Sequence, residues 1–190
     1  MNSDTVHLFM KLARADRWDR TTLSRLVQPH ELDRDARAAL PGGHTLVVDE
    51  SGTEPTGAYV TSAVFHQPEP DEEPDEDELC HAWTTPDWDL DPVGDSAAFL
   101  TAWRADRDTV SALIGAQPAV ELIEQDGNHW HTALWPMGRN ALALAQTEHF
   151  DSYSLFDMTA LWVCRRDGSG PPVPDPAYAW LTEFPRLLGN

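Results

Sequence analysis

Two histidines, His129 and His131, stand two positions apart in a stretch with strand character, so both imidazoles are expected on one face of that strand. Such a pair can supply two ligands to a metal ion, or the proton-transfer groups of an active site. A metal site needs further ligands, and Glu124, predicted to lie across a hairpin from His129, is the candidate third ligand. Leu122, predicted to lie across from His131, supplies none. The competing interpretation is an ordinary strand with an exposed His–Glu pair.

A second acid–base pair, His149 and Asp151, lies in a predicted loop. A carboxylate beside a histidine is one setting for a general base. The chain lacks the G-x-S-x-G and H-E-x-x-H motifs, a phosphate-binding loop and a dinucleotide fingerprint. The enzyme hypothesis is therefore one of unknown reaction, with or without a metal ion, and no cofactor is expected. Its candidate residues are His129, His131, Glu124, His149 and Asp151.

The densest charge lies in residues 69–95, here called the acidic segment, which hold twelve carboxylates and neither Lys nor Arg. They carry most of the formal net charge of -19. Residues 1–40, in contrast, hold seven basic and six acidic side chains. A surface so rich in carboxylates attracts basic proteins and repels nucleic acid. The spacing of the acids lacks the D-x-[DN]-x-[DN]-G pattern of a calcium loop.

The charge favours a small acidic protein that binds a basic protein partner, as an inhibitor, an antitoxin or immunity protein, or a nucleic-acid mimic. Trp83 and Trp88 stand among the acids and would provide apolar anchors. Asp87 and Asp89 are assigned to specific ion pairs, and residues 72–78 to electrostatic steering. The predicted partner-binding residues are Glu72, Glu73, Asp75, Glu76, Asp77, Glu78, Trp83, Asp87, Trp88 and Asp89.

Two interpretations of the acidic segment need no partner. The segment could be a solvated loop that only maintains solubility. It could also be neutralised within the molecule by Arg14, Arg17, Arg20 and Arg25. The partner hypothesis requires the segment to be held in place and presented outward, because ordering a free loop would consume much of the binding free energy.

A length of 190 residues predicts a single domain, residues 1–190, with an acidic loop at 67–78 and a Pro/Gly connector at 168–176. Eight tryptophans indicate a folded chain. Cys80 and Cys164 are too few for a disulfide framework, and residues 1–11 do not resemble a signal peptide. No stretch reaches the roughly 18 consecutive apolar residues of a membrane helix. We therefore expect a cytoplasmic protein that binds neither membranes nor nucleic acid directly, and the oligomeric state stays open.

Helical spacing and capping residues predict five helices. A helix capped by Ser3 or Asp4 should run to about Arg17, and a short one should follow Thr21 or Thr22. Asp95 and Gly115 should bound the longest helix, which Asp106 on its apolar face should bend or break. The remaining two are predicted at residues 30–40, after Pro29, and at residues 177–188, where Pro185 disturbs the pattern.

Strands are predicted between these helices. Asp126-Gly127 predicts a two-residue type I′ hairpin turn, because both central residues need positive φ. Hairpins outnumber βαβ units, which favours an α+β fold with a largely antiparallel sheet of about five to seven strands. N-terminal, central and C-terminal helices are expected to pack on this sheet. The predicted strands are residues 45–48, 58–66, 120–125, 128–135, 141–147 and 158–165, and residues 79–83 are a further candidate.

Overall fold

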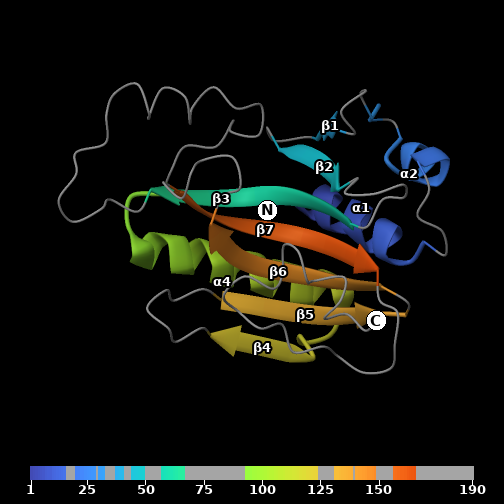
Figure 1. Ribbon diagram of the computed structural model, residues 1–190. Helices are drawn as coiled ribbons and strands as arrows, with labels where there is room; N and C mark the ends of the chain where they lie inside the picture. The colour runs from blue at the N-terminus through green and yellow to red at the C-terminus, as the bar shows by residue number, and fades with distance from the viewer. Residues whose placement is uncertain are drawn as a thin grey trace, which may run out of the picture.

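The computed structural model describes residues 1–15, 20–28, 30–32, 37–40, 44–49, 57–66, 93–123, 131–138, 140–148 and 156–165. They form a seven-stranded sheet in the order β1-β2-β3-β7-β6-β5-β4, and every neighbouring pair is antiparallel (Figure 1). The predicted α+β class and antiparallel sheet are confirmed. The strands are β1 (Arg37–Ala39), β2 (Thr45–Asp49), β3 (Gly57–His66), β4 (Val120–Ile123), β5 (His131–Met137), β6 (Asn140–Glu148) and β7 (Phe156–Arg165).

The described residues contain three helices, α1 (Ser3–Ala13), α2 (Arg20–Leu26) and α4 (Ser96–Ile114). The predicted boundaries of α1 were wrong at both ends. Asn2 is the N-cap, and its side chain accepts a hydrogen bond from the Thr5 amide at 2.8 Å. Asparagine is one of the preferred residues at this position. The helix ends at Ala13, where the side-chain amide of Asn140 donates to the buried Ala13 carbonyl at 2.8 Å. The predicted C-terminal helix and residues 79–83 lie outside the described residues.

The helix predicted at residues 30–40 was wrong, because strand β1 occupies part of this range. Ala38 pairs with Leu46 of β2 and is buried, whereas Ala39 is exposed. Burial therefore changes from one residue to the next, as in an edge strand, and not with the period of a helix. The alanines favour a helix locally, and pairing with β2 overrides that preference.

Helix α4 confirms its predicted boundaries. The Asp95 carboxylate accepts a hydrogen bond from the Ala98 amide at 2.7 Å, and Gly115 ends the helix with a φ of 76°. The predicted break at Asp106 was wrong, because α4 is continuous through this residue. Asp106 is buried and its carboxylate lies 2.5 Å from the Met1 ammonium group. An ion pair with the start of the chain thus lets the helix bury an acid.

Replacing Asp106 with asparagine is expected to lower the free energy of unfolding by about 1–3 kcal/mol, because the buried ammonium group loses its counter-ion. Urea unfolding followed by tryptophan fluorescence measures the change. Asp108 on the same helix has a side chain that is 69% exposed, so Asp108→Asn is the matched control and should cost at most about 1 kcal/mol. Equal losses in the two variants would contradict a special role for the buried pair.

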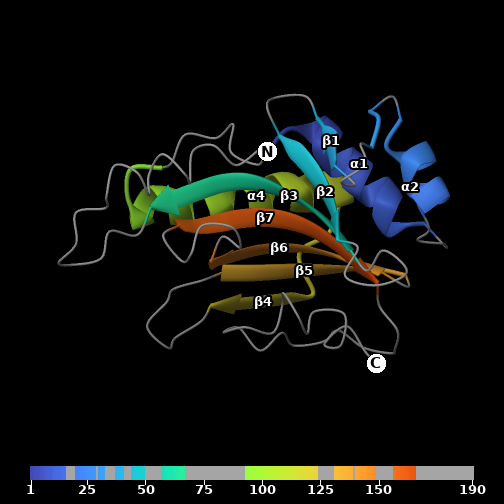
Figure 2. The same cartoon turned by 45° about the horizontal axis from the view of Figure 1, so that its top comes forward.

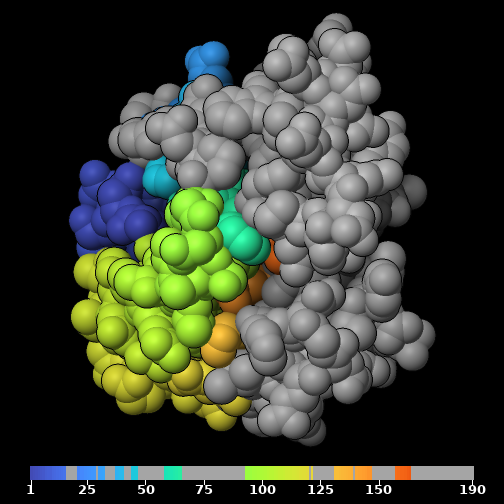
Figure 3. Space-filling view, turned by 90° about the vertical axis from the view of Figure 1, so that its left-hand side faces the viewer, coloured from blue at the N-terminus to red at the C-terminus, as the bar shows by residue number. Residues whose placement is uncertain are grey.

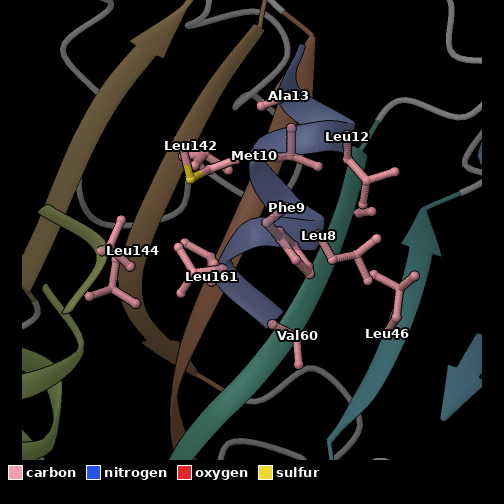
Figure 4. Packing of buried hydrophobic residues seen from close by; sticks show 14 of the residues in the cluster. Leu8, Phe9, Met10, Leu12, Ala13, Leu46, Val60, Leu142, Leu144 and Leu161 are labelled. Carbon is pink, nitrogen blue, oxygen red and sulfur yellow. The ribbon is translucent and has the colours of Figure 1, made fainter. Parts of the chain in front are cut away.

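Helices α1 and α4 pack on the same face of the sheet, here called the helix-covered face (Figures 1 and 2). Figure 4 shows Phe9 of α1 pointing toward the strands that carry Val60 and Leu161. All three of these side chains are fully buried. Leu142 and Leu144 of β6 belong to the same hydrophobic cluster. The first core thus lies between the helices and the inward-facing residues of the central strands.

The opposite side of the sheet, here called the second face, carries its own buried cluster. Alternation along a strand sends neighbouring residues to opposite faces, so Ala143 lies behind Leu144. A bulge between Thr61 and Ala63 shifts this alternation along β3. Tyr59 and Trp162 stack on the second face with ring centroids 4.4 Å apart. The buried members of the cluster are Val64, Leu134, Ala141, Ala143, Ala145, Met158, Ala160 and Trp162.

Candidate functional site

The ten residues predicted to bind a partner all lie between positions 67 and 92, outside the described residues. The structure does describe where the chain enters and leaves this stretch. Phe65 forms a parallel bridge with Val93, and the Val93 amide donates to the carbonyl of Val64 at 2.8 Å. The ring of Phe65 also stacks on Phe99 of α4, with centroids 5.6 Å apart. The two ends of the stretch are therefore fastened together.

This fastening, here called the base of the acidic segment, lies where β3 ends and α4 begins. Figure 3 shows β3 and α4 reaching the surface side by side at this end of the molecule. Figures 1 and 2 both place α2 and the end of α1 at the opposite end of the sheet. Arg14 and Arg25 belong to that opposite end. Arg14 and Arg25 thus lie away from the base.

His131 is the one member of the alternative catalytic set that the structure describes. It begins β5 and is buried, on the helix-covered face. Its amide donates to Oε1 of Gln146 at 3.1 Å, and its ring lies 5.0 Å from the ring of Trp103. Both neighbours are buried themselves. The imidazole is thus packed between sheet and helix, as a core residue is.

Arg107 of α4 lies over the ring of Trp103 and connects α4 to the edge strand β4 through Glu121. Its guanidinium carbon is 5.7 Å from the centre of the Trp103 ring. It donates to Asp108 at 2.7 Å and to Glu121 at 2.8 Å. These bonds raise the pKa of Arg107, the bond to Asp108 most, followed by Glu121, while partial burial opposes them. The guanidinium group remains a permanent cation.

The hairpin register differs by one residue from the prediction. Ile123, and not Leu122, pairs with His131. A two-residue turn at Asp126-Gly127 would have set the other register. A shift of one residue exchanges the faces of a strand, and the observed register puts Glu121 on the side where it meets Arg107. Contacts with α4 accompany the observed register, and the local turn signal did not reveal them.

Glu124, His129, His149 and Asp151 lie outside the described residues. Their distances to His131 therefore stay a prediction. Among the residues that the structure does describe, no three His, Cys, Asp or Glu side chains are arranged to hold a metal ion. What the described part shows of this set is one buried histidine with a packing role.

Sequence reasoning overlooked a polar hollow beside α1. It has a volume of about 270 Å³ and lies between α1 and the chain that follows α2. His7 and Lys11 line it from α1, and Gln28 and His30 line it from the other side. The spacing of His7 and Lys11, four positions apart on a helix, was the available signal. No spacing rule connects them with His30, because the turn after α2 brings it there.

Comparisons with protein-family models, with curated proteins and with solved structures find nothing that matches this chain. The function must therefore be argued from its own residues. In the part of the chain that the structure describes, no helix has the length and apolar character to cross a membrane.

Proposed function

We propose that this chain is an acidic protein that binds a basic protein partner through the acidic segment, as an inhibitor, an antitoxin or immunity protein, or a nucleic-acid mimic. The observation that carries the proposal is the base at Phe65 and Val93, which fastens both ends of a stretch rich in carboxylates to the folded body. Fastened ends reduce the entropy that the segment loses on binding. The proposed site of action is the cytoplasm, and nucleic acid is not a proposed ligand, because the charge has the wrong sign.

The placement of three described arginines, Arg14, Arg25 and Arg107, also supports a partner outside the chain. Arg14 follows the last turn of α1 and Arg25 lies in the last turn of α2, and these helix ends lie at the other end of the sheet from the base. Arg107 is already occupied by Asp108 and Glu121. These cations are therefore poorly placed to neutralise carboxylates where the segment starts and ends. A separate basic protein is the proposed source of compensating charge.

A matched pair of triple variants tests the proposal. Asp75→Asn, Glu76→Gln and Asp77→Asn remove three charges from the acidic segment, and Asp4→Asn, Glu31→Gln and Asp108→Asn remove three exposed charges elsewhere. Wild-type and variant proteins capture partners from a lysate of the source organism, and the shared basic partner is identified by mass spectrometry. Its dissociation constant is then measured with purified proteins at about 50 and about 300 mM NaCl. These concentrations lie below and above physiological ionic strength, so they differ in how strongly salt screens the charges.

The segment variant should bind at least about tenfold more weakly at low salt, a loss of about 1.4 kcal/mol. The control variant has the same net charge as the segment variant but keeps the acidic segment intact, so it should stay within about threefold of wild type, because single exposed charges and surface ion pairs contribute little. Wild-type affinity should also fall as salt rises, and that of the segment variant should fall less. Equal losses in both variants, or an affinity that salt leaves unchanged, would refute the proposal.

A further inference from the structure

The second face of the sheet is covered, and the described helices do not cover it. Ala143, Ala145, Ala160 and Met158 have no exposed surface. A bare sheet face would leave such residues open to water. Helices α1 and α4 both contact the opposite face (Figures 1 and 2). Among the described residues, no helix accounts for this burial.

We infer that residues 177–188 form a helix that packs on the second face and completes a helix–sheet–helix sandwich. β7 is a central strand and ends at Arg165, so 25 residues of chain follow it. The inference does not depend on the proposed partner. The apolar residues at helical spacing in this stretch are Ala177, Trp180, Leu181, Phe184, Leu187 and Leu188.

The dimensions of the two surfaces agree. A helix over residues 177–188 would be about 18 Å long at 1.5 Å per residue. The second-face cluster comes from four adjacent strands, β3, β7, β6 and β5, which span about 14 Å at 4.8 Å per step. Residues 166–176 can extend about 36 Å, enough to return along the sheet. Pro185 removes one backbone hydrogen bond near the end of the helix, which bends it without removing the stripe.

The shapes of the two surfaces are also complementary. Ala141, Ala143, Ala145 and Ala160 leave a shallow bed on the second face, whereas Leu142 and Leu144 stand on the other face of the same strand β6. Small residues on a sheet leave room for large side chains of a covering layer. Trp180, Leu181 and Phe184 are large enough to fill that room. The polar residues between them would face water.

The acidic segment is the other long stretch beyond the described residues, and it is the poorer cover. The eleven carboxylates of residues 69–91 would lose hydration against an alanine surface with few partners. Trp88 could reach an apolar face only by drawing Asp87 and Asp89 toward it. The terminal stretch brings an apolar stripe with few charges. Charge and pattern together therefore favour residues 177–188.

Hydrogen exchange followed by mass spectrometry tests the inference on the full chain. In the wild type, amides of residues 181–188 apart from Pro185 should exchange at least about tenfold more slowly than in an unstructured peptide, because the first four amides of a helix have no partner within it. Leu181→Asp with Phe184→Asp should abolish this protection and speed exchange in β6 and β7, with α4 changed least. Thr182→Asp, on the polar side of the predicted helix, is the matched control and should leave the pattern unchanged.

Disulfide trapping gives a second readout that keeps the fold intact. In a Cys80→Ser, Cys164→Ser background, Ala143→Cys is paired in turn with Leu181→Cys, Phe184→Cys or Trp83→Cys. At least one of the terminal pairs should oxidise within one molecule, and the Trp83 pair should not, because a disulfide needs Cα atoms within about 7 Å. Trapping with Trp83→Cys, unprotected terminal amides, or protection that depends on protein concentration would each overturn the inference, the last in favour of a second copy.

Discussion

Replacing Trp103 with alanine is expected to lower the free energy of unfolding by about 3–5 kcal/mol, the range for a deleted core aromatic ring. Trp103 is almost fully buried between α4 and the sheet. Its indole nitrogen donates to the carbonyl of Leu144 at 3.4 Å, and its ring packs on His131 and Arg107. Alanine would leave a cavity between α4 and strands β5 and β6. A loss of this size is a large part of the total stability of a domain.

Chemical unfolding of Trp103→Ala, monitored by circular dichroism at several urea concentrations, measures the loss. Trp103→Phe keeps most of the ring and removes only the long hydrogen bond, so it should cost about half as much or less. If Trp103→Phe is as damaging as Trp103→Ala, the hydrogen bond and not the packing holds α4, and our interpretation of the site would be wrong.

The second large effect is expected at Asn140, where the sheet joins the end of α1. The amide of Asn140 is buried and donates to the carbonyls of Ala13 and Ala15, at 2.8 and 3.1 Å. Asn140→Asp removes both donors and places a carboxylate against the negative end of the helix dipole. A buried carbonyl and a partly buried one lose their partner, so the expected cost is about 2–4 kcal/mol.

Asn140→Ala is the reference for this variant. It removes the same donors without adding charge, and should cost about 2 kcal/mol. The difference between the two variants, measured by urea unfolding at neutral pH, isolates the electrostatic part. Should the aspartate variant be the more stable one, Asn140 does not act on the helix end through its amide donors.

Local signals in the sequence were reliable where the structure depends on local chemistry. Asp95 and Gly115 predicted the ends of α4, because capping involves residues within one turn of each other. The helix predicted over residues 37–39 was wrong because their structure depends on a neighbour that is distant in the sequence. Their strand exists because β2 lies beside them, and a neighbour supplied by the fold is invisible in the composition of a short stretch.

The hairpin between β5 and β6, the tightest among the described strands, was also only partly predictable from the sequence. Asp126-Gly127 gave the clear turn signal, but Met137 pairs with Asn140 around Gly138, which has a φ of 71°. Gly138 at a two-residue turn could have been read from the sequence. The hydrogen bonds of Asn140 to the end of α1 could not, because they join residues more than 120 positions apart.

The candidate site was predictable only in its chemistry. The carboxylates of residues 69–95 can be counted in the sequence, but their attachment at Phe65 and Val93 cannot. His131 was singled out as half of a His-x-His pair. The residues beside it in the sequence did not indicate that α4 would bury it. Whether an ionisable residue faces water or a helix depends on packing between elements that are distant in the sequence. This packing cannot be predicted from the sequence around the residue.

The bridge between Phe65 and Val93 also allows the acidic segment and the sheet to evolve separately. An insertion or deletion within residues 67–92 leaves all the paired residues of β3 and β7 in place. Doubling the length of a flexible loop costs only about 0.6 kcal/mol in closure entropy. Natural selection can therefore lengthen, shorten or recharge the intervening stretch to follow a changing target, while the scaffold beneath it stays the same.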